Sequence, residues 1–420
     1  MSLDDALQRA GRAGLLPAAV AALVGLVMAA TLSIRTALAD YQMRRGTLEG
    51  MSAAIALAPD NAEYPARLAF LLTEEDPPKA GGAVRRAVQL DPWDSASWID
   101  LGLRAEAERD EPRAQQCLLR AAEVDRKFLP RWTLANYYLR HNDAARVWVW
   151  AKAAAAMVYG DARPLFRFCG RVQEDGQLIE RLEIRDPDVR GEYLGYLVDQ
   201  NRLDLIGPAV ERLLRENRAA DGPLLLTVCE KLLEAGRPGE AEEIWERLRP
   251  GAKGTQLLTN GDFGSPPSSR GLDWRLGSIE GVSVSQEKHG VRVTFSGREP
   301  EECEALTQLV PLTGNTRYQL QFGYRTAGIA SGAALGWRIT DAASGAVLRD
   351  GPSLASDADV EQRLDFETPR QCRLVRLALR YRRMPGTTLM EGFLNLRGAR
   401  LQAVGQTQTQ SPMDGARVRK

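Results

Sequence analysis

Residues 90–125 read LDPWDSASWIDLGLRAEAERDEPRAQQCLLRAAEVD, and this stretch organises the first half of the chain. Trp98 and Leu101 are three residues apart, so they lie on one face of a predicted helix. The Asp91-Pro92 pair ends the preceding helix, because the residue before proline is pushed out of the α region. Small or apolar residues recur where a second helix would pack on the first: Gly102, Ala114, Leu118 and Ala121.

These residues resemble the tetratricopeptide repeat, whose pattern combines a tryptophan, a Leu-Gly pair, two alanines around a large apolar residue, and an Asp-Pro stop. Leu57-Ala58-Pro59-Asp60 precedes Leu90 by 33 residues, and Val124-Asp125 follows it by 34. One such hairpin cannot bury its apolar face alone, so neighbours must stack on it. We therefore expect residues 40–250 to form an α-solenoid of about six hairpins. A non-repetitive helical bundle that uses Asp-Pro stops is the alternative.

Bulk composition limits the classes of function. The chain has 420 residues, enough for two or three domains. Its 55 basic and 55 acidic side chains cancel, which argues against a nucleic-acid partner. The two histidines, His141 and His289, have no cysteine or second histidine nearby, so we expect no metal site. Cys303 and Cys372 could form a disulfide, but sequence alone cannot establish that geometry.

Residues 15–35 are the candidate membrane segment. From Leu15 to Ile34 no residue is charged, and about twenty apolar residues span the ~30 Å core of a bilayer. Ala37-Leu38-Ala39 resembles a signal-peptide cleavage site, so a cleaved signal is the alternative, and a buried globular helix is a third interpretation. We favour an uncleaved anchor, because the apolar run is longer than a usual signal core and Arg35 separates it from that site.

The orientation of this segment does not follow from its flanking charges, since arginines lie on both sides of it. We expect residues 1–14 in the cytoplasm and the bulk of the chain outside it. That placement depends on the resemblance of the C-terminal domain.

The composition changes after a predicted linker, residues 251–255. Short alternating runs replace the alanine-rich helical pattern, for example in residues 291–295, 318–325 and 335–339. Several short strands with one apolar face, spread over ~150 residues, predict an antiparallel β-sandwich in residues 256–404. Residues 405–420 have no apolar period, and we expect them to be disordered.

The opening of the sandwich region carries a second resemblance. Residues 257–263 read LLTNGDF, Trp274 follows eleven residues later, and residues 308–316 contain a strand and a turn. Together these features resemble jelly-roll carbohydrate-binding modules of the galactose-binding-like class. The resemblance implies a jelly-roll fold and carbohydrate as the ligand class. Many members of the class bind no sugar, so a structural role for the sandwich stays open.

Four arginines are candidate glycan-binding residues of this domain. Period-two alternation puts Leu320 and Trp337 on the core face, and the arginines on the opposite face: Arg325, Arg338, Arg376 and Arg380. If they converge on one concave sheet, they form a basic groove suited to acidic glycans. The alternative is a solvated face neutralised by Asp365 and Glu367. Trp274 is either a sugar-stacking platform or a plug in the core.

We find no phosphate-cradling glycine-rich loop and no Gly-x-Ser-x-Gly elbow, and we expect neither catalysis nor a cofactor. The expected function is a scaffold, single-pass in the inner (cytoplasmic) membrane, that acts in exopolysaccharide or cell-envelope assembly. Its solenoid would bind other envelope proteins, and its sandwich acidic polysaccharide. One alternative is an adaptor whose sandwich caps the solenoid without binding sugar. Another is an enzyme with an unrecognised pair of carboxylates in the sandwich.

Overall fold

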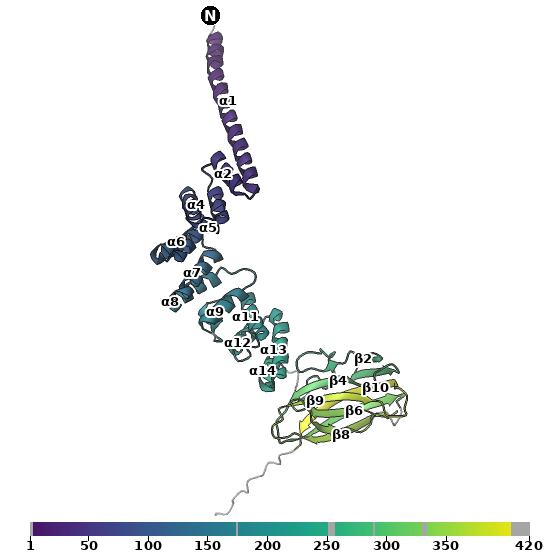
Figure 1. Ribbon diagram of the computed structural model, residues 1–420. Coiled ribbons are helices and arrows are strands. Elements are labelled where there is room, and N and C mark those ends of the chain that lie inside the picture. The colour runs from purple at the N-terminus through teal and green to yellow at the C-terminus, as the bar shows by residue number, and fades with distance from the viewer. Residues whose placement is uncertain (1–2, 174, 251–256, 289, 330–333, 405–420) are drawn as a thin grey trace, which may run out of the picture. The chain divides into compact units, whose positions relative to one another are not determined.

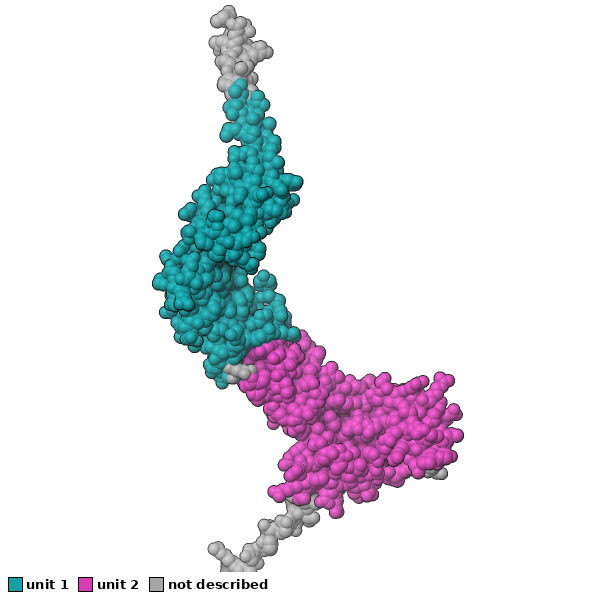
Figure 2. Space-filling view, in the orientation of Figure 1, with its two compact units in different colours: residues 1–189 teal, residues 190–420 magenta. Residues whose placement is uncertain are grey.

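The computed structural model describes residues 3–173, 175–250, 257–288, 290–329 and 334–404, with side chains from residue 20 onward. The predicted linker 251–255 and the predicted disordered tail 405–420 lie outside the described residues. The chain forms two compact units, residues 1–189 and residues 190–420, coloured separately in Figure 2. The first unit is helical, and the second combines helices with a β-sandwich (Figure 1).

The first unit is a succession of helices joined by short turns. They are α1 (Leu3–Arg44), α2 (Leu48–Leu57), α3 (Glu63–Leu71), α4 (Pro77–Leu90), α5 (Ser95–Ala107), α6 (Glu111–Val124), α7 (Phe128–Arg140), α8 (Ala144–Ala155), α9 (Arg163–Val172) and α10 (Leu178–Arg181). Helix α11 (Pro187–Asp199) runs from the first unit into the second. Helix α10 has only four residues, so the hairpin to which it belongs is shorter than its neighbours.

The turns between helices repeat with the sequence. Helices α4 and α6 end one residue before Asp91 and Asp125, respectively. Asp91 Oδ1 accepts a hydrogen bond from the backbone N of Trp93 at 2.9 Å, and Asp125 Oδ1 accepts one from the backbone N of Lys127 at 3.0 Å. Each carboxylate therefore bonds the chain two residues on, as in an Asx turn. The prediction of a helical, tetratricopeptide-like region is confirmed.

Helix α1 contains the apolar segment and also packs on the helical repeats through its last turns. Among the described residues, one helical segment, Val20–Arg44, is long and apolar enough to cross a membrane. Its last turns pack on the repeats, since Ala39 is fully buried beside Ala54 and Tyr64. The Tyr64 hydroxyl donates to Asp40 Oδ1 at 2.6 Å. One continuous helix thus extends from the predicted span 15–35 into the first hairpin.

The second unit begins with the rest of α11 and continues with α12 (Gly207–Glu216), a short 3-10 helix (Ala219–Asp221), α13 (Gly222–Glu234) and α14 (Pro238–Leu248). Ten strands follow: β1 (Arg275–Leu276), β2 (Val282–Glu287), β3 (Gly290–Ser296), β4 (Glu302–Pro311), β5 (Arg317–Ala327), β6 (Ala334–Asp341), β7 (Val347–Asp350), β8 (Val360–Glu367), β9 (Leu374–Arg382) and β10 (Glu391–Ala403).

The strands form two five-stranded antiparallel sheets. Sheet A has the order β1-β4-β9-β6-β7, and sheet B has the order β2-β3-β10-β5-β8. Strands β3 to β10 are therefore divided between the sheets in the order of a double Greek key jelly roll, with the consecutive strands β6 and β7 paired in sheet A. The predicted antiparallel sandwich is confirmed.

The sandwich core lies between the two sheets. Alternation along the strands sends Leu320 and Phe322 of β5 and Trp337 of β6 inward, where each is at most 2% exposed. The Trp337 ring packs edge-on against Phe322, with 5.8 Å between centroids. Both outer faces are consequently left to polar side chains.

Candidate functional site

A groove in the helical unit lies between α3 and α5. It has a volume of about 800 Å³, and α3, the α3–α4 turn and α5 line it. Helices α3 and α5 are the first helices of successive hairpins, and stacked hairpins of this kind form extended surfaces.

Two exposed apolar side chains lie in this groove. Phe70 of α3 is 80% exposed and Leu103 of α5 is 40% exposed. Residues 69–72 read Ala-Phe-Leu-Leu, a run of four apolar residues in which Ala69 takes the fully buried position. A helix cannot turn four consecutive side chains to one face, so Phe70 is left facing solvent. Phe70 was not among the predicted site residues, although the run of four apolar residues was a usable signal.

The rim of the groove is acidic. Four carboxylates line it, and they belong to Glu74, Glu75, Asp100 and Glu108, whereas Arg104 supplies the one lining cation. Arg104 is neutralised locally, because its Nε lies 2.9 Å from Asp100 Oδ1 and its Nη2 donates to Thr73 Oγ1 at 2.8 Å. The remaining three glutamates give the groove an excess of negative charge.

The predicted repeat residues hold α5 and α6 together beside the groove. Trp98 is half-buried, and its Nε1 donates to the carbonyl of Pro92 at 2.9 Å. A Cβ built on Gly102 would lie 2.7 Å from Leu118 Cγ and 3.2 Å from the carbonyl oxygen of Ala114. Cβ atoms in proteins essentially never make a contact as short as 2.7 Å, so α5 and α6 can pack this closely only because residue 102 is glycine. The remaining predicted positions are buried: Leu101, Ala114, Leu118 and Ala121.

The sandwich does not gather the four predicted arginines on one face. Arg325 lies on β5 in sheet B, whereas Arg338 is on β6 and Arg376 and Arg380 are on β9, all in sheet A. The expectation of a single basic groove is therefore wrong. Residue alternation shows which side of its own strand a residue takes, but not which sheet that strand joins.

The three arginines of sheet A are paired with carboxylates. Arg338 Nε donates to Asp350 Oδ1 at 2.7 Å and holds the pKa of that carboxyl below its ordinary value. Arg376 pairs with Glu304 and Arg380 with Glu302. The outer face of sheet A is thus largely neutralised, as the alternative interpretation expected. The expected partners were wrong, because Asp365 and Glu367 lie on β8 of sheet B.

Trp274 is a core residue. Its side chain has no exposed area, stacks on Phe263 at a centroid distance of 5.3 Å and donates from Nε1 to the carbonyl of Asn260 at 3.0 Å. A sugar ring cannot reach it, so Trp274 is excluded as a stacking platform. Through this hydrogen bond and the stacking on Phe263, the indole holds the Asn-Gly-Asp-Phe turn against the core.

Sheet B carries a network of amides and guanidinium groups on its outer face. Gln319 Nε2 donates to Asp365 Oδ1 at 2.8 Å, and Gln321 donates to the side chain of Gln319. On the far side of β5, Arg292 Nε donates to Asn395 Oδ1 at 2.9 Å. Arg325 lies opposite Asn395 in the same row. This face therefore presents both donors and acceptors to solvent.

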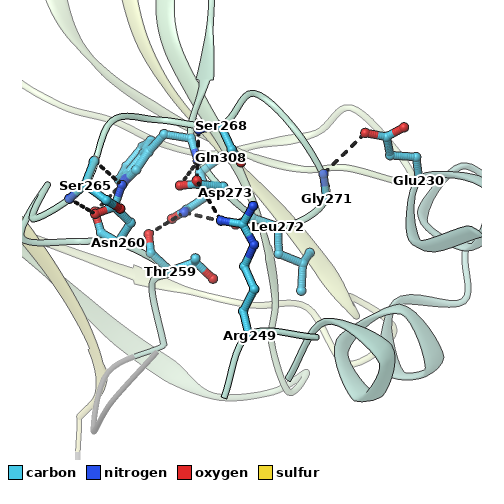
Figure 3. Close-up of polar contacts among 11 residues, drawn as sticks. Glu230, Arg249, Thr259, Asn260, Ser265, Ser268, Gly271, Leu272, Asp273 and Gln308 are labelled. Carbon is cyan, nitrogen blue, oxygen red and sulfur yellow. Dashed lines mark hydrogen bonds and ion pairs between the residues drawn. The ribbon is translucent and has the colours of Figure 1, made fainter. Parts of the chain in front are cut away.

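Within the second unit, α13 and α14 contact the loop that precedes β1. Arg270 Nε donates to Glu230 Oε1 at 2.7 Å. The backbone N of Gly271 donates to the same oxygen at 3.3 Å (Figure 3). Gly271 has φ +57°, and a Cβ there would lie 2.4 Å from the ring of Trp245, which is fully buried. The sandwich thus covers the apolar end of the last helical hairpin.

Gln308 ties this junction to the sandwich. Its Nε2 donates to the carbonyl of Thr259 at 2.8 Å and to that of Leu272 at 3.1 Å, and the side chain is buried (Figure 3). Asp273 Oδ2 accepts from the backbone N of Ser268 at 2.9 Å. The two stretches that carried the resemblance to carbohydrate-binding modules therefore meet in one polar cluster.

Neither a metal site nor a disulfide occurs in the part of the chain that the structure describes. No group of three His, Cys, Asp or Glu side chains there is arranged to hold a metal ion. All five cysteines are buried free thiols, so Cys303 and Cys372 do not pair. Burial raises the pKa of Cys303 to about 11 and that of Cys169 to about 12.

No protein-family model matches the chain. No curated protein matches it either. Similarity is found among solved structures. One of them, described as "CBM4 structure and function", is 11% identical over 35% of this chain and 99% of its own, with a TM-score of 0.28.

Two of the helical structures illustrate the other group of similar proteins. PilF of Pseudomonas aeruginosa is 17% identical over 53% of this chain and 93% of its own, with a TM-score of 0.27. YrrB, described as a TPR protein with an unusual peptide-binding site, is 12% identical over 48% of this chain and 92% of its own, with a TM-score of 0.26. At these TM-scores the similarities carry no argument about function, which depends on the contacts described above.

Proposed function

We propose that this chain is a membrane-tethered, extracytoplasmic scaffold that binds a partner protein in the groove between α3 and α5. The exposure of Phe70 carries the proposal. A phenylalanine that is 80% exposed beside Leu103, at the rim of a groove of about 800 Å³, is the kind of apolar anchor on which protein partners bind. The role is structural rather than catalytic.

Helix α1 supports the tether. The apolar residues from Val20 onward and the last turns, which pack on α2 and α3, belong to one helix. The Nη2 of Arg35 donates to the carbonyl of Leu57 at 2.8 Å. Cleavage after Ala39 would remove Arg35 and Ala39 and cut the helix where it packs on the repeats. The packing therefore favours an uncleaved anchor over a cleaved signal peptide.

Site-specific crosslinking in cells tests the groove. Phe70 is replaced by the photoreactive amino acid p-benzoylphenylalanine, and in a matched strain Tyr159, which is 88% exposed outside the groove, is replaced in the same way. The proposal expects a discrete crosslinked protein from position 70 and none of the same size from position 159. Identical bands from both positions, or none from position 70, would contradict a partner in the groove.

Glycan binding by the sandwich is the second candidate function, and the face of sheet B supports it. Hydrogen-bond donors and acceptors cross four strands there, and Arg325 has no ion pair among the described residues. Guanidinium forks suit carboxylates, so uronic-acid polymers are the ligand class. With such a ligand the scaffold would act in exopolysaccharide or cell-envelope assembly, with its bulk outside the inner membrane.

Affinity electrophoresis of the full chain in nonionic detergent, through gels containing alginate or a neutral glucan, tests this second function. The expectation is retardation by alginate that Arg325→Ala weakens and that the double variant Arg338→Ala/Arg376→Ala leaves nearly unchanged, because carboxylates already pair those two arginines. Loss in the double variant alone would move the site to sheet A. No retardation in either gel would favour the sandwich as a cap on the last helical hairpin.

A further inference from the structure

We propose that the groove between α3 and α5 selects a basic, linear polypeptide segment that carries one bulky apolar side chain. This inference depends on the proposed function, since it names the class of partner for the same groove. Three independent features carry it: unpaired carboxylates, the ends of two helices, and an exposed aromatic anchor.

The first feature is uncompensated negative charge. Glu74, Glu75 and Glu108 line the groove, and none of the three has an ion pair among the described residues. The cation in the lining, Arg104, is already engaged by Asp100 and Thr73. An arriving cation therefore meets free carboxylates without displacing an existing partner. Exposed charges act over a Debye length of roughly 8 Å at physiological ionic strength.

The second feature is the direction of the helices. Helix α3 ends at Leu71 and α5 ends at Ala107, and both residues line the groove. The C-terminal end of a helix carries about half a negative elementary charge on its free carbonyl groups. Backbone N–H groups of the following turns occupy several of these carbonyls, for example those of Leu68 and Arg104, so the two ends add only a partial negative charge to that of the glutamates. The first turn of α4, at Pro77, also lines the groove, but the carboxylate of Asp76 caps it and offsets its positive end.

The third feature is the apolar surface formed by Phe70 and Leu103. The negative charge of the groove argues against macromolecular partners that are themselves negatively charged. Nucleic acids, anionic lipid surfaces and acidic polysaccharides are all negatively charged and would be repelled by this rim. A groove of about 800 Å³ falls in the ~300–1,000 Å³ range of pockets that enclose compact ligands, so it has room for a short chain segment. A basic peptide with one aliphatic or aromatic anchor satisfies both the charge and the volume.

Fluorescence anisotropy of the full chain in nonionic detergent tests the inference. The probes are the fluorescein-labelled peptide GKRSKFKRG, in which phenylalanine is the one bulky apolar residue, and its charge-inverted partner GEDSEFEDG. We expect only the basic peptide to bind, with an affinity that falls as sodium chloride rises. Phe70→Ala should weaken that binding roughly tenfold or more, the typical loss when a central apolar anchor is truncated. Because Phe70 is exposed, circular dichroism should show an unchanged fold.

A matched pair of double variants separates the groove from bulk charge. Glu75→Gln/Glu108→Gln removes two carboxylates from the groove, and Glu49→Gln/Asp60→Asn removes two exposed carboxylates of the same unit that do not line it. The first pair should weaken binding at least tenfold and the second less than twofold. Equal losses, or preference for the acidic peptide, would overturn the inference.

The failure of this inference is distinguishable from the failure of the proposed function. If a partner crosslinks to position 70 but neither peptide binds, the groove is a protein site and the stated class of partner is wrong. If position 70 also yields no crosslink, both the groove and its occupant are wrong.

Discussion

Replacing Gly102 by alanine should destabilise the helical unit, although alanine is the better helix former. In a helix interior, Gly→Ala gains about 0.5–1 kcal/mol from backbone entropy and propensity. The new Cβ would lie 2.7 Å from Cγ and 2.8 Å from Cδ2 of Leu118. Leu118 is fully buried, so its side chain cannot swing into solvent. Overpacking of this kind costs about 1–3 kcal/mol, which leaves a net loss of about 1 kcal/mol. Gly102→Leu should lose about 3 kcal/mol or more, because three further carbons enter the same contact.

Gly81→Ala is the matched control, because Gly81 lies inside the neighbouring helix α4. A Cβ there meets only Arg85 Nη1, at 3.7 Å, which is an ordinary contact with the end of a flexible side chain. Gly81→Ala should therefore gain about 0.5–1 kcal/mol. Urea denaturation of the full chain in nonionic detergent, followed at 222 nm, measures both shifts in midpoint. If Gly102→Ala raised the midpoint as Gly81→Ala does, the helices would not approach at Gly102 and the argument would fail.

Four further results are expected. Deleting residues 1–35 should give a folded chain that is monodisperse without detergent by light scattering, because the last turns of α1 remain on the repeats; aggregation would mean that the apolar segment is part of the fold. All five thiols should resist Ellman's reagent at pH 8 and react stoichiometrically in guanidinium, since every cysteine is buried and free; fewer than five would indicate a disulfide. Arg140 lowers the pKa of Glu106 below its ordinary 4.5. The stability that the Glu106–Arg140 pair contributes is therefore complete above pH 4.5 and is lost as the pH falls through the lower folded pKa of Glu106. Glu106→Gln should accordingly flatten the fall in thermal midpoint below pH 4.5; equal slopes in the variant and the parent protein would refute this prediction. Gly271→Val should lower the unfolding midpoint of the second unit by differential scanning calorimetry, because its side chain would collide with Trp245; an unchanged midpoint would mean that the loop does not pack on α14.

Local chemistry was readable from the sequence. The Asp91 turn and its counterpart at Asp125 depend on contacts within two residues, so a repeat could be predicted from their spacing. The alternation of β5 and β6 depends on the two-residue period of a strand, and it correctly assigned Leu320 and Trp337 to the core. The change from helical to alternating pattern likewise separated the helices from the sandwich.

Only the tertiary structure decided which of these elements meet. The expected arginine groove failed because Arg325 and Arg338 lie in different sheets, and strand pairing joins residues far apart in the chain. The carboxylate partner of Arg380 is Glu302, 78 residues away, a pairing that no local period encodes. The exposure of Phe70 likewise depends on what α5 leaves uncovered. Whether these side chains are buried or paired depends on residues that are distant in the sequence and meet only in the folded chain. Helix caps, turns and strand alternation depend instead on residues close together in the sequence.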